Sequence, residues 1–224
     1  MHPFWNTIFG AKAPTVSFCE SATALIIARP ISFLSNLPYI GIGLYLISRK
    51  NQAGYLIGGA SMLVGVASML YDASYTFGAQ TIDLMAMMIL IHVFFYSALH
   101  PYVRSAYPLI VLLLSNQLIY AALVIMLEGR IGQIYFALMV LGYVLLEVIL
   151  AQREPKRHTR YFWYAVITFM FGVLLWLPDG LGLWCPEWSV FSGRVLYHII
   201  TAFAVLFVYQ HIQANAHRQV KSPE

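Results

Sequence analysis

Six ionisable side chains stand at the ends of the long apolar segments of this sequence. Charged groups are costly inside a membrane, so residues of this kind usually take part in function or pair with one another. Carboxylates and imidazoles can move protons or bind a metal ion, whereas a guanidinium stays protonated and pairs with anions. The six residues are Glu20, Arg29, Asp72, Asp83, Arg194 and His198.

Two pairs of these polar residues have the spacing of one helical turn. Ser68 lies four residues before Asp72. Arg194 likewise lies four residues before His198. Residues four apart project from the same face of a helix, so each pair can point into one pocket.

The elements that carry these side chains are predicted to be membrane-spanning helices. Hydrophobic residues make up 60% of the 224 residues and charged residues only 10%, which no water-facing domain of this length shows. A bilayer core needs about 20 mostly apolar residues per helix. The fold class is therefore an all-α integral membrane bundle of seven transmembrane helices in one domain, residues 1–224, with spans of about 31–48, 53–72, 82–100, 106–127, 131–151, 161–177 and 193–212.

The distribution of Lys and Arg predicts the orientation of this bundle. With seven spans the two termini lie on opposite sides, and basic residues concentrate in cytoplasmic loops. We therefore expect the N-terminus outside and the C-terminus in the cytoplasm, with the six ionisable residues lining one outward-opening pocket. Nine basic residues then face the cytoplasm, Arg49, Lys50, Arg104, Arg153, Lys156, Arg157, Arg160, Arg218 and Lys221, and four lie outside, Lys12, Arg29, Arg130 and Arg194.

Both cysteines fall on the predicted outer side. Cys19 precedes the first span and Cys185 lies in the loop before the seventh. Outside the cytoplasm a disulfide is the favoured state, and it would close a long loop over the pocket. Two free buried thiols are the alternative.

Other polar residues within the spans are predicted to have structural roles. Glu147 lies near the cytoplasmic end of the fifth span, where it can reach the interface or pair with Arg153. We expect His92, Asn116 and Gln117 to form hydrogen bonds between helices.

Four blocks of residues follow one another in a fixed order between about 18 and 202. They are Phe18-Cys19-Glu20 with the segment 28–36, Ser68-x-x-x-Asp72 with Asp83, Asp179 with Cys185, and Arg194-x-x-x-His198. In order and spacing these blocks resemble the signature of the alkaline ceramidases and their bacterial relatives. In that family a Cys-Glu pair precedes a segment of the type Ala-Glu-Pro-x-Asn-x-x-Ser-Asn.

The resemblance implies a seven-helix membrane hydrolase that uses zinc to activate a water against a lipid amide. It also implies a calcium site near the N-terminus and an extracytoplasmic disulfide between the two cysteines. Three protein ligands hold the zinc and leave one position for a water whose pKa falls towards neutrality. In this family template Ser68 would stabilise the developing oxyanion and Asp83 would handle the proton.

The sequence departs from the family pattern at the zinc site. Of the three histidine ligands expected, only His198 is present, because Asp72 occupies the first position and Arg194 the second. Aspartate can bind zinc, but a guanidinium cannot. If a metal is bound at all, His198 and Asp72 are its candidate ligands.

A second departure affects the calcium site. Arg29 stands in place of the family's calcium-binding Glu, and Ser32 in place of an Asn. We expect Arg194 to pair with Asp72 and Arg29 with Glu20, so that each guanidinium replaces the positive charge of a lost metal.

These departures favour a ceramidase-like protein with a degraded metal site and no cofactor. It would bind a membrane lipid in its outward-facing pocket without catalysis, or serve as a subunit or scaffold of a membrane assembly. The alternative is an active lipid amide hydrolase in which Asp72, His198 and Asp83 hold zinc in a rearranged set or act with Arg194 as an electrophile. A receptor or transporter that shares only the seven-helix outline is a third alternative.

The partners and location follow from the same features. The basic residues lie in short loops, where they act as orientation signals, so nucleic acid is not an expected partner. The short loops and the Arg29-Pro30 version of the first block are closer to bacterial members of the family. We therefore expect an integral protein of a bacterial inner membrane.

Overall fold

The computed structural model describes residues 2–16, 18–23, 25–127, 131–183, 185 and 191–219. Every regular element in these ranges is a helix. Three elements are short, α1 (Pro3–Phe9), α2 (Pro30–Leu34) and the 3-10 helix η1 (His100–Tyr102). The long helices are α3 (Leu37–Ser48), α4 (Gln52–Ser74), α5 (Phe77–Leu99), α6 (Ala106–Leu127), α7 (Ile131–Arg153), α8 (Arg160–Gly180) and α9 (Gly193–Gln219).

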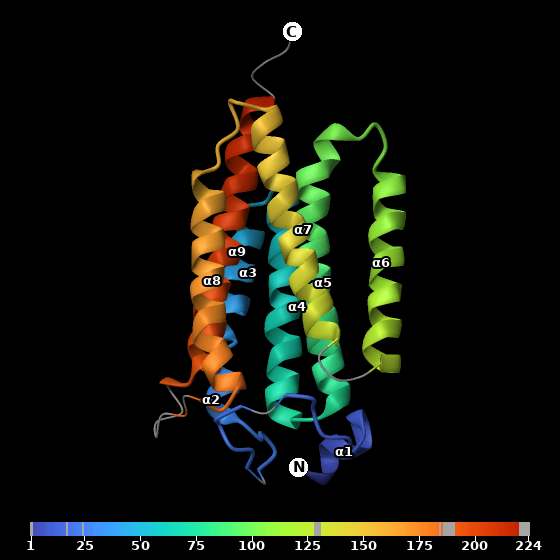
Figure 1. Cartoon of the computed structure of the whole chain (residues 1–224), viewed down its shortest axis with the longest axis vertical. Coiled ribbons are helices and arrows are strands. Elements are labelled where there is room, and N and C mark those ends of the chain that lie inside the picture. The colour runs from blue at the N-terminus through green and yellow to red at the C-terminus, as the bar shows by residue number, and fades with distance from the viewer. Residues whose placement is uncertain are drawn as a thin grey trace.

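The long helices run side by side along one axis, with the two ends of the chain at opposite ends of the bundle (Figure 1). Seven segments are long and apolar enough to cross a membrane, which confirms the predicted fold class. They are Pro30–Ser48, Gln52–Ser74, Phe77–Tyr102, Ala106–Leu127, Ile131–Arg153, Arg160–Gly180 and Gly193–Ala216. The first combines α2 and α3.

Most of these segments extend by a few residues beyond the spans predicted from hydropathy, and the third and the seventh extend furthest. The third begins at Phe77 instead of 82, because Gln80 and Asp83 are buried against the protein and do not mark the end of the helix. The seventh continues past 212, where Gln213 donates a hydrogen bond to Asn51 Oδ1 over 3.0 Å. Polar residues with partners inside the bundle therefore lengthen both helices.

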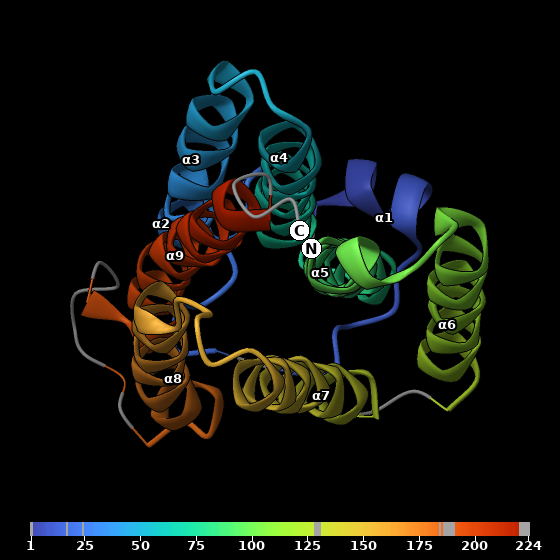
Figure 2. The same ribbon diagram turned by 90° about the horizontal axis from the view of Figure 1, so that it is seen from above.

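Small residues let neighbouring helices approach closely. A Cβ atom added to Gly43 of α3 would lie 2.7 Å from the carbonyl oxygen of Gly58 in α4, and the reverse contact has the same length. Helix association in membranes depends on such close backbone packing. Seen from above, α3, α4, α8 and α9 gather on one side, while α6 stands at the opposite edge beside α5 and α7 (Figure 2).

Hydrogen bonds between side chains join these outer helices. His92 Nε2 of α5 lies 2.8 Å from Asn116 Oδ1 of α6, and Asn116 donates to the Tyr135 hydroxyl of α7 over 2.6 Å. Gln117 donates to the Met85 carbonyl oxygen over 3.3 Å. The predicted interhelical role of His92, Asn116 and Gln117 is thus confirmed.

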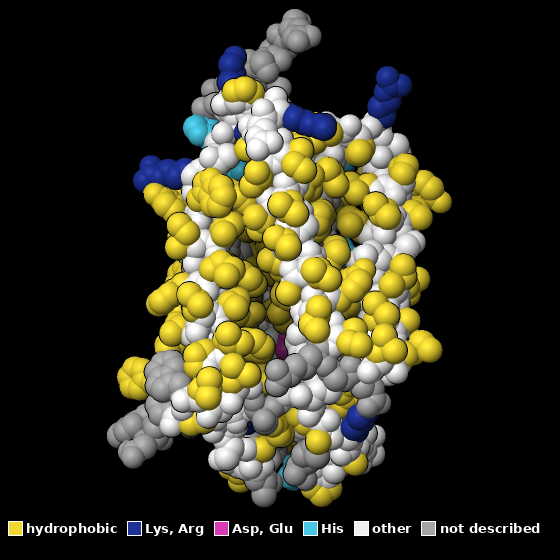
Figure 3. Space-filling view, viewed as in Figure 1, with side chains coloured by type: hydrophobic (Ala, Val, Ile, Leu, Met, Phe, Trp, Pro, Cys, Tyr) yellow, Lys and Arg dark blue, Asp and Glu magenta, His cyan; other side chains and the backbone are white. Residues whose placement is uncertain are grey.

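Basic side chains gather at the end of the bundle where the C-terminus lies (Figure 3). This arrangement agrees with the charge distribution along the sequence. Arg130 and Lys221, two of the basic residues used to predict the orientation, lie outside the described residues. The direction of the bundle across a membrane stays a prediction.

A buried charged network closes the bundle at this same end. Glu147 of α7 is 1% exposed, and its Oε2 accepts from Arg157 Nη2 over 2.8 Å and Nε over 3.1 Å. The Nε2 atom of His211 in α9 lies 3.0 Å from the same oxygen. Glu147 therefore pairs with Arg157 and not with Arg153, which is exposed, because the loop after α7 turns back over the carboxylate.

We expect Arg157→Ala to lower the free energy of unfolding by about 3–5 kcal/mol, because it removes the guanidinium that compensates a buried carboxylate. Thermal and chemical unfolding of the purified protein in detergent measure the change. Arg153→Ala is the matched control and should shift stability by no more than about 0.5 kcal/mol. Equal effects of the two substitutions would contradict the assignment.

Candidate functional site

Asp72, in the last turns of α4, is the centre of the buried polar site. Its Oδ1 atom lies 2.7 Å from Arg29 Nη2 and 3.0 Å from Arg194 Nη2, and it accepts a hydrogen bond from Arg194 Nε over 3.1 Å. The Oδ2 atom accepts from Asn36 Nδ2 over 3.0 Å. Asp72 and Arg29 are completely buried, so two guanidinium groups share one carboxylate in the interior of the bundle.

Backbone hydrogen bonds bring Arg29 to this carboxylate. The N–H groups of Ala28 and Arg29 donate to the carbonyl oxygens of Ala73 and Asp72 over 2.9 and 3.0 Å. The segment before α2 therefore runs along the end of α4. Pro30 then begins α2, where its missing N–H costs no hydrogen bond.

Aromatic rings enclose both guanidinium groups. The Cζ atom of Arg29 lies 4.3 Å from the centre of the Tyr75 ring and 4.9 Å from that of Tyr71. The Cζ atom of Arg194 lies 4.3 Å from the Phe18 ring centre. A cation over a ring face is attracted by the ring quadrupole, so these rings help to stabilise the two buried positive charges beside Asp72.

Glu20 has a different partner from the one predicted. Its Oε1 accepts from the Ile31 N–H over 3.0 Å, and its Oε2 accepts from the Ser32 N–H and hydroxyl over 2.9 and 2.5 Å. The carboxylate thus caps the first turn of α2, where unpaired N–H groups favour an anion. The predicted pair of Arg29 with Glu20 is wrong, because Arg29 reaches Asp72 instead.

His198 of α9 contacts the first membrane span. Its Nδ1 atom lies 2.8 Å from the Ser35 hydroxyl, which donates to the Ser32 carbonyl oxygen over 2.7 Å. Sequence reasoning gave no role to Ser35 or to its neighbour Asn36. The sequence signal that could have identified them is that two adjacent polar residues lie inside an apolar span.

Ser68 and Asp83 form the remaining wall of the site. The Ser68 hydroxyl donates to Asp83 Oδ1, and both side chains are buried. They line one pocket together with Arg194 and His198. The structure thus brings together Ser68, Asp83, Arg194 and His198, while Glu20 is not among the residues that line this pocket.

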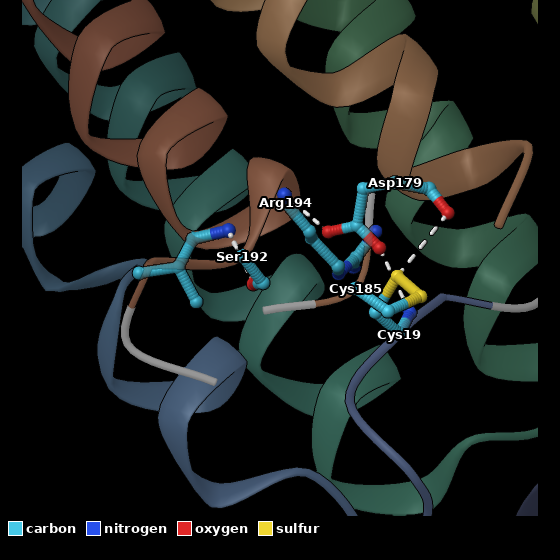
Figure 4. The surroundings of a disulfide bond; sticks show 6 residues. Cys19, Asp179, Cys185, Ser192 and Arg194 are labelled. Carbon is cyan, nitrogen blue, oxygen red and sulfur yellow. Dashed lines mark hydrogen bonds between the residues drawn. A yellow bond between two sulfur atoms is a disulfide. The ribbon is translucent and has the colours of Figure 1, made fainter. Parts of the chain in front are cut away.

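The predicted disulfide joins Cys19 to Cys185. Asp179, at the end of α8, accepts from the Cys19 N–H over 2.8 Å and from the Arg194 N–H over 2.7 Å, as Figure 4 shows. Asp179 is 1% exposed. A covalent bond and a buried carboxylate therefore hold the N-terminal segment against the start of α9.

The residues present do not fit the zinc ion of the family template. The oxygens of Asp72 are taken by two guanidinium groups and an amide, and these fixed cations repel a dication. The Nδ1 atom of His198 is occupied by Ser35. Among the described residues, no group of three His, Cys, Asp or Glu side chains is placed to hold a metal.

An apolar cavity adjoins the polar pocket. The polar pocket and the cavity share the residues Tyr39, Val64, Met87 and Tyr197. Side chains of α5, α7, α8 and α9 form most of the cavity wall. In the space-filling view a hollow runs between α7 and α8, and an acidic side chain is visible at its lower end (Figure 3).

Seven apolar helices around a buried polar pocket define a polytopic integral membrane protein. The chain matches the Ceramidase family model over residues 10–223, and it therefore belongs to the ceramidase family. No match was found among curated proteins.

We expect Asp72→Asn to lower the free energy of unfolding by about 3–5 kcal/mol, because two buried guanidinium groups lose their counter-charge. Unfolding of the purified protein in detergent measures the loss. Adding Arg29→Met should recover part of the stability, since one of the uncompensated cations is then removed. A double variant that is less stable than the single variant would contradict the shared-carboxylate arrangement.

Replacing Cys19 and Cys185 together by serine should reduce stability by about 2–5 kcal/mol, because the bond closes a loop of more than a hundred residues. Thermal unfolding with and without a reductant tests this. The reductant should lower the stability of the native protein and leave the double variant unchanged. Equal sensitivity of both proteins would show that the bond is not the cause.

Proposed function

We propose that this member of the ceramidase family binds the acyl chain of a membrane lipid without hydrolysing it. The observation that carries the proposal is the Asp72 carboxylate, which two buried guanidinium groups occupy where the family template has a zinc ligand. Without a Lewis acid, a water beside His198 and Asp72 lacks the means to become a strong nucleophile at neutral pH.

The shape and chemistry of the interior support a lipid ligand. The polar pocket contains charged side chains and suits a headgroup, and the adjoining cavity is lined by residues such as Val140, Phe169 and Met170. Ligand sites typically combine an apolar wall with a few polar groups. The hollow between α7 and α8 gives an acyl chain a lateral route from the bilayer (Figure 3).

The Ser68–Asp83 hydrogen bond favours one alternative, an active lipid amide hydrolase. In that scheme Asp83 handles the proton and Ser68 stabilises the oxyanion. Zinc would be held by a rearranged set that includes Asp72 and His198, or Arg194 would act as the electrophile. The rearranged set requires Asp72 to leave both guanidinium groups, which is why we place this function second.

Three further expectations extend the proposal. The pocket opens on the outer side, the protein resides in a bacterial inner membrane, and the bundle also serves as a subunit or scaffold for other membrane proteins. Each stays a prediction from the sequence. The exposed apolar side chains of α6 suit either lipid or a neighbouring helix.

The proposal predicts that the purified full-length protein binds a fluorescent N-acylsphingosine and releases no fatty acid, with or without added zinc. Binding is followed by fluorescence and release by mass spectrometry, and metal analysis should find no stoichiometric zinc. Asp83→Ala is the control. Like the native protein, this variant should release no fatty acid. Release that disappears in Asp83→Ala would establish the hydrolase instead.

A further inference from the structure

The apolar cavity has a defined end, opposite the polar pocket. On α9 its wall passes from Tyr197 through Thr201 and Val205 to Val208. His198, in the polar pocket, lies ten residues before Val208, which corresponds to about 15 Å along the helix axis. An extended acyl chain therefore has a limited length available inside the bundle.

Three aromatic side chains close this end of the cavity. The ring centres of Phe94 and Tyr143 are 5.7 Å apart, and those of Tyr143 and Phe162 are 6.5 Å apart. All three side chains are buried and belong to the cavity wall. We refer to Phe94, Tyr143 and Phe162 as the aromatic layer.

The charged network of the bundle stands directly behind the aromatic layer. The Tyr143 hydroxyl donates to Glu147 Oε1 over 3.3 Å, and the Phe162 ring centre is 5.6 Å from that of His211. Glu147 is also bound by Arg157. Because separating buried charges is costly, methylene groups cannot push past the rings into this network.

We propose that the aromatic layer sets the maximum length of the acyl chain that the cavity holds. The inference rests on the proposed lipid-binding function and adds a specificity determinant to it. With the headgroup beside Arg194 and His198, an extended chain of roughly 12 carbons fills the 15 Å to the layer. Methylene groups beyond that length stay outside the apolar cavity and add no affinity.

The test is competition binding of N-acylsphingosines that differ only in acyl length, from octanoyl to eicosanoyl, on the purified full-length protein. Affinity should rise up to about the dodecanoyl chain and then level off, since each methylene that finds room adds packing contacts with the cavity wall. In Phe162→Ala the plateau should begin at a longer chain. Ala204 lies in the middle of the cavity wall. In Ala204→Phe the added ring fills part of the cavity, so the plateau should begin at a shorter chain.

Phe95→Ala is the matched control. The Phe95 ring centre lies 5.6 Å from that of Tyr143, but Phe95 is not part of the cavity wall. Losing this ring should change stability and leave the plateau where it is.

Two results would overturn the inference in distinguishable ways. Binding with the same plateau in the native protein, Phe162→Ala and Ala204→Phe would show that the varied acyl chain does not reach the aromatic layer. The proposed lipid binding would then stand and the aromatic layer would not set chain length. No binding of any chain length to the folded native protein would remove the proposed function and this inference together.

Discussion

A buried carboxylate shared by two arginines is the interaction on which the rest of the site depends. Asp72 links the segment before α2, the end of α4 and the start of α9 through Arg29 and Arg194. In a low-dielectric interior an uncompensated charge is costly, so removing any one of these three side chains destabilises the other two. The aromatic rings and Asn36 complete the compensation. The two arginines connect these segments through Asp72 as a bound metal ion would. Unlike a metal ion, they provide no coordination position for a water.

The two ends of the bundle are organised on the same principle and enclose an apolar middle. At one end Asp72 and Asp179 gather donors, and at the other Glu147 binds Arg157 and His211. Each carboxylate fixes helices that are distant in the sequence. Because both ends are polar and hydrogen-bonded, the space between them is an apolar compartment. The lipid-binding proposal follows from this division.

Much of the fold was predictable because hydropathy reports directly on the bilayer. Order and spacing also identified the residues of the site, including the pairing of Asp72 with Arg194. The partner of Arg29 was not predictable, because Glu20 and Asp72 are both carboxylates and the choice depends on how the chain passes the end of α4. Arg157 was missed for a similar reason, since a loop that turns back over Glu147 leaves no periodic pattern. The apolar cavity depends on packing between six helices, which the sequence pattern does not reveal.

The disulfide between Cys19 and Cys185 has a consequence for how the protein is made. Its two halves come from opposite ends of the polypeptide, and Arg194, which completes the charge cluster, emerges only with the last helix. During synthesis the N-terminal segment must therefore wait, with a reduced thiol and an incompletely compensated site, until six helices have been inserted. Oxidation is therefore a late step of biogenesis, which can take place only after α8 has been made.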